Sequence, residues 1–190
     1  MTKRTSPLRI ALLALLVFAV GVAGVLAGSG IRAFLGRGSP EAMVRAATRS
    51  LLKEGQAFPD VSIAAGDPDV LHTATLCRGE GGVFLFLDLE CPPCVDMSRK
   101  WQDAIDRNVI PDRQVLGITN HAADIADDFR AQNALTFRIG EDTGRVFHHD
   151  HRVQRFPLEV VVDASGRIRS TSYDSRGAVD PGRLAELLAN

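Results

Sequence analysis

An α/β fold behind an N-terminal membrane-spanning segment is predicted by three features of the 190-residue sequence. Segments typical of strands alternate with segments typical of helices, and the chain ends in a strand–turn–strand and a last helix. An uncharged, strongly apolar run occupies residues 10–31. A Cys-Pro-Pro-Cys sequence directly follows the most hydrophobic strand candidate. The first feature predicts the architecture, the second the location and the third the chemistry.

Composition limits the possible classes of protein. The chain is 24% charged and 45% hydrophobic, with a formal net charge of −1. It is long enough for one domain of roughly 100–150 residues with its own core. These values exclude a collagen, a coiled coil and a low-complexity disordered chain. A near-neutral charge also argues against a dedicated nucleic-acid binder, so we expect no nucleic-acid partner.

The N-terminal 31 residues are expected to lie outside the globular fold. Residues 1–9 form a short basic tail, and the 22 residues 10–31 carry no charge. As a helix they would reach about 33 Å, enough to cross a bilayer core of roughly 30 Å. A basic tail before an apolar run also describes a secretory signal, with Val25–Ala27 as a cleavage site. Both interpretations stay open, and both export the rest of the chain.

We therefore expect a domain outside the cytoplasm, since the basic tail is more easily retained than translocated. In a bacterium this would be the periplasmic face of the membrane, or the periplasm or medium if the segment is cleaved. Residues 32–54 are predicted to form a linker and a membrane-proximal helix that begins near Pro40 and ends before Gly55. The globular domain is assigned to residues 55–190.

Strands are predicted wherever short runs of apolar and β-branched residues lie between turn residues. Residues 81–89, Gly-Gly-Val-Phe-Leu-Phe-Leu-Asp-Leu, are an apolar run rich in strand formers and should form a central strand buried on both faces. A brief segment, residues 137–139, is ambiguous. The remaining strand candidates are residues 61–64, 70–76, 113–119, 158–163 and 167–173.

Helices are predicted at residues 94–108, 122–133 and 181–189. In the first, Val95, Trp101 and Ile105 are candidates for the buried side. In the second, Ile125 and Phe129 are four residues apart and should share a buried face. Pro181 lies near the first turn of the third, where its missing N–H removes no helical hydrogen bond. Strands that alternate with helices in this way favour a sheet covered by helices.

The Cys91-Pro92-Pro93-Cys94 sequence is the strongest chemical signal, because it ends a strand and opens a helix. A helix N-terminus favours a thiolate on Cys91, and Cys94, one turn further, is placed to attack a mixed disulfide at Cys91. Half of a zinc site and a purely structural disulfide are the alternatives. The remaining cysteine, Cys77, cannot complete a four-thiolate site and is expected at a strand edge as a half-buried apolar residue.

The sequence resembles membrane-anchored thioredoxin-fold thiol–disulfide oxidoreductases of the TlpA/ResA type over about residues 55–190. The matching stretches are Gly55–Asp60, Gly82–Cys94 and the segment from Arg155 to Ile168. The resemblance implies a thioredoxin-like fold, a mixed sheet flanked by helices. It also implies a cis-proline at Pro157 beside the cysteines, with the backbone of Phe156 pairing with a bound substrate. An ordinary turn proline is the alternative for Pro157.

Three positions depart from that family and leave the substrate open. Glu90 stands where the family usually has an aromatic residue, and Met97 where some cytochrome-maturation members carry a glutamate. Phe156 is bulkier than the usual residue before the cis-proline. Glu90 is a candidate modulator of the cysteine chemistry, because its charge disfavours a second negative charge on the Cys91 sulfur. We therefore expect a potential nearer to about −270 mV than to about −120 mV.

Two other functions remain as alternatives. Peroxiredoxins share the fold, but they place Thr or Ser three residues before the reactive cysteine, where this chain has Asp88, and a proline four residues earlier, where it has Phe84. A copper chaperone would use Cys91, Cys94 and a histidine, and a histidine cluster spans residues 148–151. A histidine-rich surface turn is the simpler interpretation of that cluster. His121 is predicted to be an ordinary loop residue.

The resulting hypothesis is a dithiol–disulfide exchange enzyme outside the cytoplasm that reduces protein disulfides. Cys91 is the nucleophile and Cys94 the resolving residue. No metal and no cofactor beyond a redox-active Cys91–Cys94 disulfide is expected. The expected partners are protein thiols or disulfides and a membrane electron donor that recharges the dithiol. The physiological substrate cannot be inferred from these residues.

Overall fold

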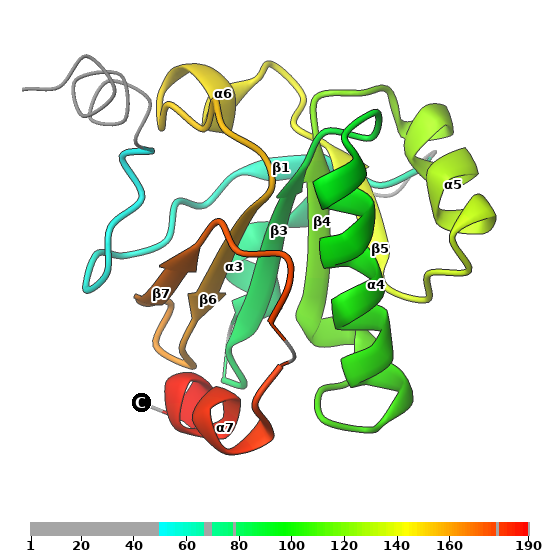
Figure 1. The fold of residues 1–190 in the computed structure, drawn as a ribbon. Coiled ribbons are helices and arrows are strands. Elements are labelled where there is room, and N and C mark those ends of the chain that lie inside the picture. The colour runs from blue at the N-terminus through cyan, green and yellow to red at the C-terminus, as the bar shows by residue number, and fades with distance from the viewer. Residues whose placement is uncertain (1–49, 67–69, 78, 178, 190) are drawn as a thin grey trace, which may run out of the picture. The chain divides into compact units, whose positions relative to one another are not determined.

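The computed structural model describes residues 50–66, 70–77, 79–177 and 179–189. Seven strands form one mixed sheet in the order β2-β1-β5-β4-β3-β6-β7 (Figure 1). The strands are β1 (Ser62–Ala64), β2 (Val70–His72), β3 (Gly82–Leu87), β4 (Val115–Thr119), β5 (Arg138–Glu141), β6 (Leu158–Val162) and β7 (Ile168–Ser172). The helices are α3 (Thr73–Cys77), α4 (Pro92–Asp106), α5 (Ala123–Gln132), α6 (Val146–His149) and α7 (Pro181–Ala189), with a 3₁₀ turn, η1, at Asp112–Gln114.

The strand directions bring the chemically important loops to one edge of the sheet. β3, β4 and β5 are parallel, so their carboxyl ends lie at the same edge. β6 pairs antiparallel to β3, with Leu158 opposite Phe86, and therefore begins at that edge. The loop after β3, the loop after β4 and the segment before β6 consequently converge there.

Two hydrophobic cores cover the two faces of the sheet, because side chains alternate along each strand. From β3, Val83, Leu85 and Leu87 enter the core under α4, whereas Phe84 and Phe86 enter the core on the other face. All six residues of β3 are buried. The prediction of a central strand buried on both faces is confirmed.

Most predicted elements of the domain are present, with shifts of one or two residues at their ends. The predicted strand at residues 70–76 is wrong beyond His72, since Thr73–Cys77 form the short helix α3. The Thr73 hydroxyl donates to Pro59 O (2.7 Å) and accepts the Val61 N–H (2.9 Å), which ties the chain to the start of β1 and ends the strand. Cys77 thus ends a helix rather than lying at a strand edge.

Two details of the helices also differ from expectation. Ile125 is 47% exposed and not on the buried face of α5, where Phe129 and Ala126 pack instead. In α4, Trp101 is buried as predicted, whereas Val95 and Ile105 are only half-buried at the edge of the core. A helix that the pattern did not indicate, α6, follows β5.

The predicted tail, the apolar run and the start of the linker helix lie outside the described residues. Of the predicted linker helix, residues 50–53 are described and are not helical. They pack onto the domain: Leu52 is buried in the second core, and the Leu51 N–H donates to His151 O (2.8 Å). Within the part of the chain that the structure describes, no helix has the length and apolarity to cross a membrane.

Candidate active site

The Cys-Pro-Pro-Cys sequence forms the first turn of α4, at the edge of the sheet where β3 ends. Cys91 is the N-cap with extended backbone angles, and Pro92 and Pro93 are the first two helical residues. The N–H groups of Cys94 and Val95 both donate to Cys91 O, at 2.9 and 3.3 Å. The predicted strand–motif–helix context is therefore confirmed.

The two thiols are free in this structure and differ in their surroundings. Cys91 is half-buried between two exposed residues, Glu90 and Pro92, whereas Cys94 has no exposed surface. Burial, followed by a hydrogen bond to Cys91, raises the pKa of the Cys94 thiol far above its usual range. Cys91 is thus the sulfur that a large partner can reach, and Cys94 is held protonated behind it.

Pro157 lies at the same edge, since it precedes β6, whose first residue pairs with Phe86. The Phe156–Pro157 peptide bond is cis, as the resemblance implied. Pro157 is buried, and the half-buried Phe156 side chain packs against both cores. Phe156 and Cys91 both pack against the core under α4.

A pair that the sequence interpretation missed lies between the loops after β3 and β4. His121 Nε2 is 3.5 Å from Asp88 Oδ1, although His121 had been assigned to an ordinary loop. The Asp88 backbone N–H donates to the Cys94 sulfur (3.4 Å), and its carboxylate accepts the Glu90 N–H (3.1 Å). The parallel pairing of Leu87 with Thr119 brings these loops together. Glu90 itself is exposed.

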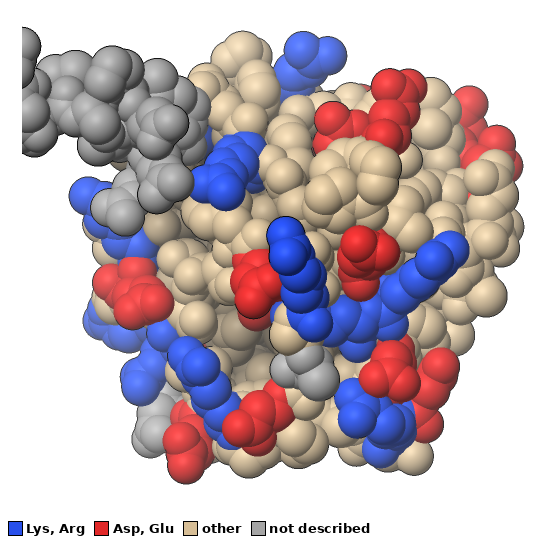
Figure 2. All heavy atoms as spheres, in the orientation of Figure 1, with Lys and Arg blue, Asp and Glu red and all other residues tan. Residues whose placement is uncertain are grey.

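Acidic side chains gather around this end of the molecule. In Figure 2 they are concentrated at the upper right, over the start of α4 and over α5. Further down α4, cationic and acidic side chains alternate, as in the Arg107–Asp103 ion pair (2.8 Å). The loop between β3 and α4, where the cysteines lie, contains Asp88 and Glu90 and no Lys or Arg.

The histidine cluster after β5 does not meet the cysteines in a metal site. His148 Nδ1 lies 3.1 Å from Val153 O, the His149 ring packs edge-on against His148, and the His151 ring lies against Phe147. Among the described residues, no group of three His, Cys, Asp or Glu side chains is placed to hold a metal ion. The copper alternative gains no support from these contacts.

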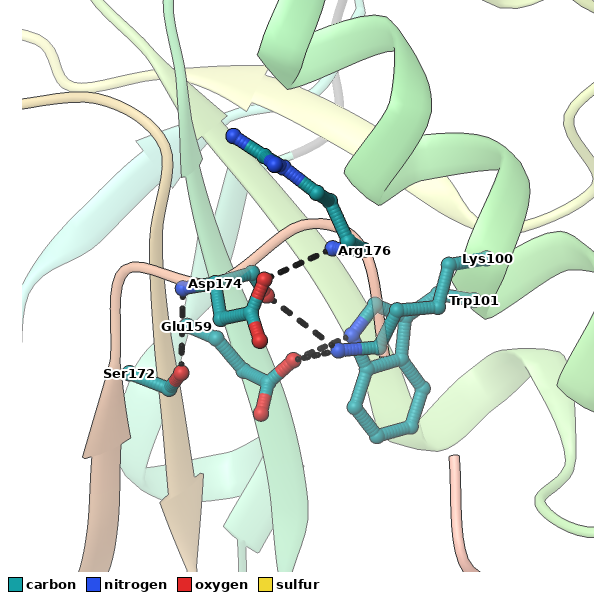
Figure 3. A network of polar contacts seen from close by, with 6 residues as sticks. All are labelled: Lys100, Trp101, Glu159, Ser172, Asp174 and Arg176. Carbon is teal, nitrogen blue, oxygen red and sulfur yellow. Dashed lines mark hydrogen bonds and ion pairs between the residues drawn. The ribbon is translucent and has the colours of Figure 1, made fainter. Parts of the chain in front are cut away.

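A buried polar network fastens α4 to β6 (Figure 3). Glu159 Oε2 accepts hydrogen bonds from Lys100 Nζ and Trp101 Nε1, both at 2.9 Å. The Lys100 and Glu159 side chains are only 13% and 12% exposed. Because Glu159 is two residues after Pro157, this network holds the helix that carries the cysteines against the strand that begins at Pro157.

No family model matches the sequence, and neither does any curated protein. Solved structures do. One is described as a protein disulfide isomerase from Bacteroides thetaiotaomicron (TM-score 0.58, 19% identity, 66% of this chain and 82% of that one). A second is described as the thiol:disulfide interchange protein DsbE from Chlorobium tepidum (TM-score 0.57, 19% identity, 72% of this chain and 95% of that one). The chain has a thioredoxin-like fold.

That fold is not restricted to one chemistry among the similar structures. PrxQ from Xylella fastidiosa is also similar to this chain, with a TM-score of 0.56 and 12% identity over 72% of this chain and 92% of that one. At these identities the comparison establishes the thioredoxin-like fold, and the activity has to be argued from the site itself.

Proposed function

We propose that the protein is an extracytoplasmic thiol–disulfide oxidoreductase of the TlpA/ResA type that reduces disulfides in other proteins. The observation that carries the proposal is the asymmetry of the cysteines: an accessible Cys91 at a helix N-terminus, with a fully buried Cys94 behind it. Such a pair suits an exchange in two steps, in which one sulfur meets the substrate and the other resolves the intermediate.

In the first step the Cys91 thiolate attacks one sulfur of a substrate disulfide. A Cys91–substrate mixed disulfide forms, and the other substrate sulfur leaves as a thiolate that takes up a proton. In the second step Cys94 loses its proton and attacks the Cys91 sulfur. The Cys91–Cys94 disulfide forms and the second substrate sulfur leaves as a thiol. The dithiol has then given two electrons to the substrate disulfide.

The cis-Pro157 segment is proposed to align the substrate chain. Pro157 cannot donate a backbone hydrogen bond, so the backbone of Phe156 is the group available for an extended peptide that lies across Cys91. The exposed Pro92 and Pro93 would border this peptide on the other side. Recognition through the main chain tolerates many sequences, which suits an enzyme with several protein substrates.

The direction of electron flow is inferred from what surrounds the sulfurs. A strong oxidant needs a stabilised thiolate, and here Pro92 and Pro93 supply no N–H group while Asp88 and Glu90 add negative charge nearby. A dithiol with little thiolate stabilisation is a reductant. In an oxidising compartment it would be recharged by a membrane electron donor, which agrees with an anchor at residues 10–31.

Trapping tests the proposed roles. A Cys94→Ser variant should hold its substrates as mixed disulfides through Cys91, visible as reducible adducts on non-reducing gels. Cys91→Ser is the matched control, because it keeps one cysteine of the motif but loses the accessible one. Equal trapping by both variants would contradict the assignment.

A redox titration against glutathione tests the direction. A potential below about −170 mV is expected for a reductant, and a value above it would favour an oxidase. The peroxidase alternative is tested in parallel: rapid consumption of hydrogen peroxide through Cys91 would replace the reductase proposal. Tight binding of Cu(I) by the reduced domain would favour the copper chaperone.

A further inference from the structure

The Asp88–His121 pair has no part in the exchange described above, although it lies beside the resolving cysteine. The two residues follow adjacent parallel strands, and Asp88 Oδ1 and His121 Nε2 are 3.5 Å apart. Their side chains are 45% and 28% exposed, so the pair is partly shielded from water and its charges are incompletely screened. It is a candidate for controlling the charge near Cys94.

Asp88 acts on Cys94 in two opposite ways. Its backbone N–H donates to the Cys94 sulfur at 3.4 Å, which favours a thiolate. Its carboxylate, by contrast, contributes to the raised pKa of Cys94, after the larger effects of burial and of the hydrogen bond to Cys91. The hydrogen bond from the Asp88 N–H is the larger of these two influences on the Cys94 pKa. The size of the opposing influence depends on whether a cation compensates the Asp88 carboxylate, and His121 is the residue paired with it.

We propose that Asp88 and His121 form an electrostatic gate on the resolving step, an inference that rests on the proposed exchange activity. With His121 neutral, the Asp88 carboxylate opposes ionisation of Cys94. With His121 protonated, the imidazolium cancels this charge, and Cys94 loses its proton to water more easily. The Cys94 thiolate then attacks Cys91, the Cys91–substrate bond breaks, and the leaving sulfur takes up a proton. Both side chains act as positioning groups, since the contact of Asp88 with the Cys94 sulfur is made by its backbone N–H and not by its carboxylate.

Other ionisable groups at this edge are engaged elsewhere or face solvent. The Asp142 carboxylate accepts the N–H groups at the start of α6. Asp124 is exposed, and its carboxylate accepts the Ile125 N–H. Glu90 is exposed, Glu141 is the half-buried last residue of β5, and Cys91 is the partner thiol. His121 is thus the described side chain that pairs with the Asp88 carboxylate, and its ring is charged only when protonated.

The resolving step can be observed directly with 5,5′-dithiobis(2-nitrobenzoate). Attack by Cys91 releases one thionitrobenzoate and leaves a mixed disulfide on Cys91. Attack by Cys94 then releases the second thionitrobenzoate. Every chain tested, the unmodified one included, carries Cys77→Ser, because the Cys77 thiol would release a third thionitrobenzoate. Stopped-flow absorbance of the reduced full chain then separates the two phases, and their rate constants are measured from pH 5.5 to 8.5.

His121→Gln should slow the second phase about threefold at pH 5.5 and leave it unchanged at pH 8.5. Asp88→Asn should accelerate it about threefold at pH 8.5. The expected factors are modest, because a gain in Cys94 thiolate is partly offset by the lower nucleophilicity of a more acidic thiol. His72→Gln on the distant edge strand β2 and Asp103→Asn on the outer side of α4 are the matched controls, and both should match the unmodified chain.

The outcomes separate the two proposals. If the unmodified chain shows no second phase, Cys94 does not resolve and the exchange activity itself is wrong. If the second phase occurs but His121→Gln changes it equally at every pH, His121 has only a structural role and the gate is overturned. A slower second phase in Asp88→Asn at pH 8.5 also overturns the gate, because the carboxylate would then accept the proton rather than oppose its loss.

Discussion

Lys100 lies on α4 and forms a largely shielded ion pair with Glu159, whose side chains are 13% and 12% exposed. Lys100 Nζ and Glu159 Oε2 are 2.9 Å apart, and the Coulomb attraction between their charges amounts to about 6 kcal/mol with an effective dielectric constant of about 20. Removing the lysine restores none of the hydration that Glu159 lost, and only the Trp101 N–H remains to stabilise the carboxylate. Breaking a fully buried pair costs about 3–5 kcal/mol, and some exposure of both groups reduces this. We expect Lys100→Met to lower the free energy of unfolding by about 2–4 kcal/mol.

Urea denaturation followed by far-UV circular dichroism measures this change, since the fluorescence of Trp101 would itself respond to the altered network. Arg107→Met is the matched control on the same helix. Its ion pair with Asp103 is 2.8 Å long, but the two side chains are 49% and 64% exposed, so the loss should stay below about 1 kcal/mol. Equal effects of the two substitutions would refute the assignment of a buried, energetically important pair.

Four further predictions follow from single positions. Gly140→Ala should lower the urea midpoint, because a Cβ would lie 2.5 Å from a β1 side chain and 2.7 Å from a backbone oxygen. Ala134→Gly should raise the free energy of unfolding by about 1 kcal/mol, since Ala134 has φ +52°. Burial raises the pKa of Asp163, but hydrogen bonds and a nearby arginine outweigh this and lower it. The contribution of the Asp163 carboxylate to the free energy of unfolding is therefore complete above about pH 4 and is lost as the pH falls further. Asp163→Asn should make the free energy of unfolding depend less on pH below about pH 4. Pro93→Ala adds an N–H at the second helical position, a usual donor to an N-cap side chain, so glutathione titration should give a potential about 20–40 mV higher.

The central strand and the cysteine motif were predictable because their signals are local. The apolar run Gly82–Leu87 favours burial, and the prolines directly after Cys91 fit the first helical turn, where their missing N–H groups remove no helical hydrogen bond. The cis bond at Pro157 came from the resemblance, since no local pattern distinguishes it from an ordinary turn proline. These features depend on neighbours in the sequence or on a known motif.

The short helices were not predictable in the same way. α3 replaces the end of a predicted strand because the Thr73 hydroxyl bonds to the chain twelve and fourteen residues away. α6 begins after Arg145, a non-glycine residue with φ +56°, and the Asp142 carboxylate accepts the N–H groups of its first residues. Both depend on side-chain contacts that override a weak periodicity.

The Asp88–His121 and Lys100–Glu159 pairs were missed for a different reason. Their members are 33 and 59 residues apart, and each pair depends on which strands become neighbours in the sheet. Once β3 is known to pair in parallel with β4, Asp88 and His121 must lie at one edge, and their charges become relevant to the cysteines. The position of His121 beside the cysteine loop therefore follows from the order of the strands and not from the residues next to it in the sequence.

The asymmetry of the two cysteines arises from where the helix begins. Cys91 stays outside the helix as its N-cap, whereas Cys94 is the third helical residue and, since side chains of a helix tilt toward its N-terminus, leans back toward the end of β3. There it meets the Asp88 N–H and loses all contact with water. The same start gives the first two helical positions to prolines, which removes the N–H of the second helical residue as a donor to the Cys91 sulfur, while the Cys94 N–H donates to Cys91 O. One helix boundary thus determines which sulfur is accessible and which one is buried beside the end of β3.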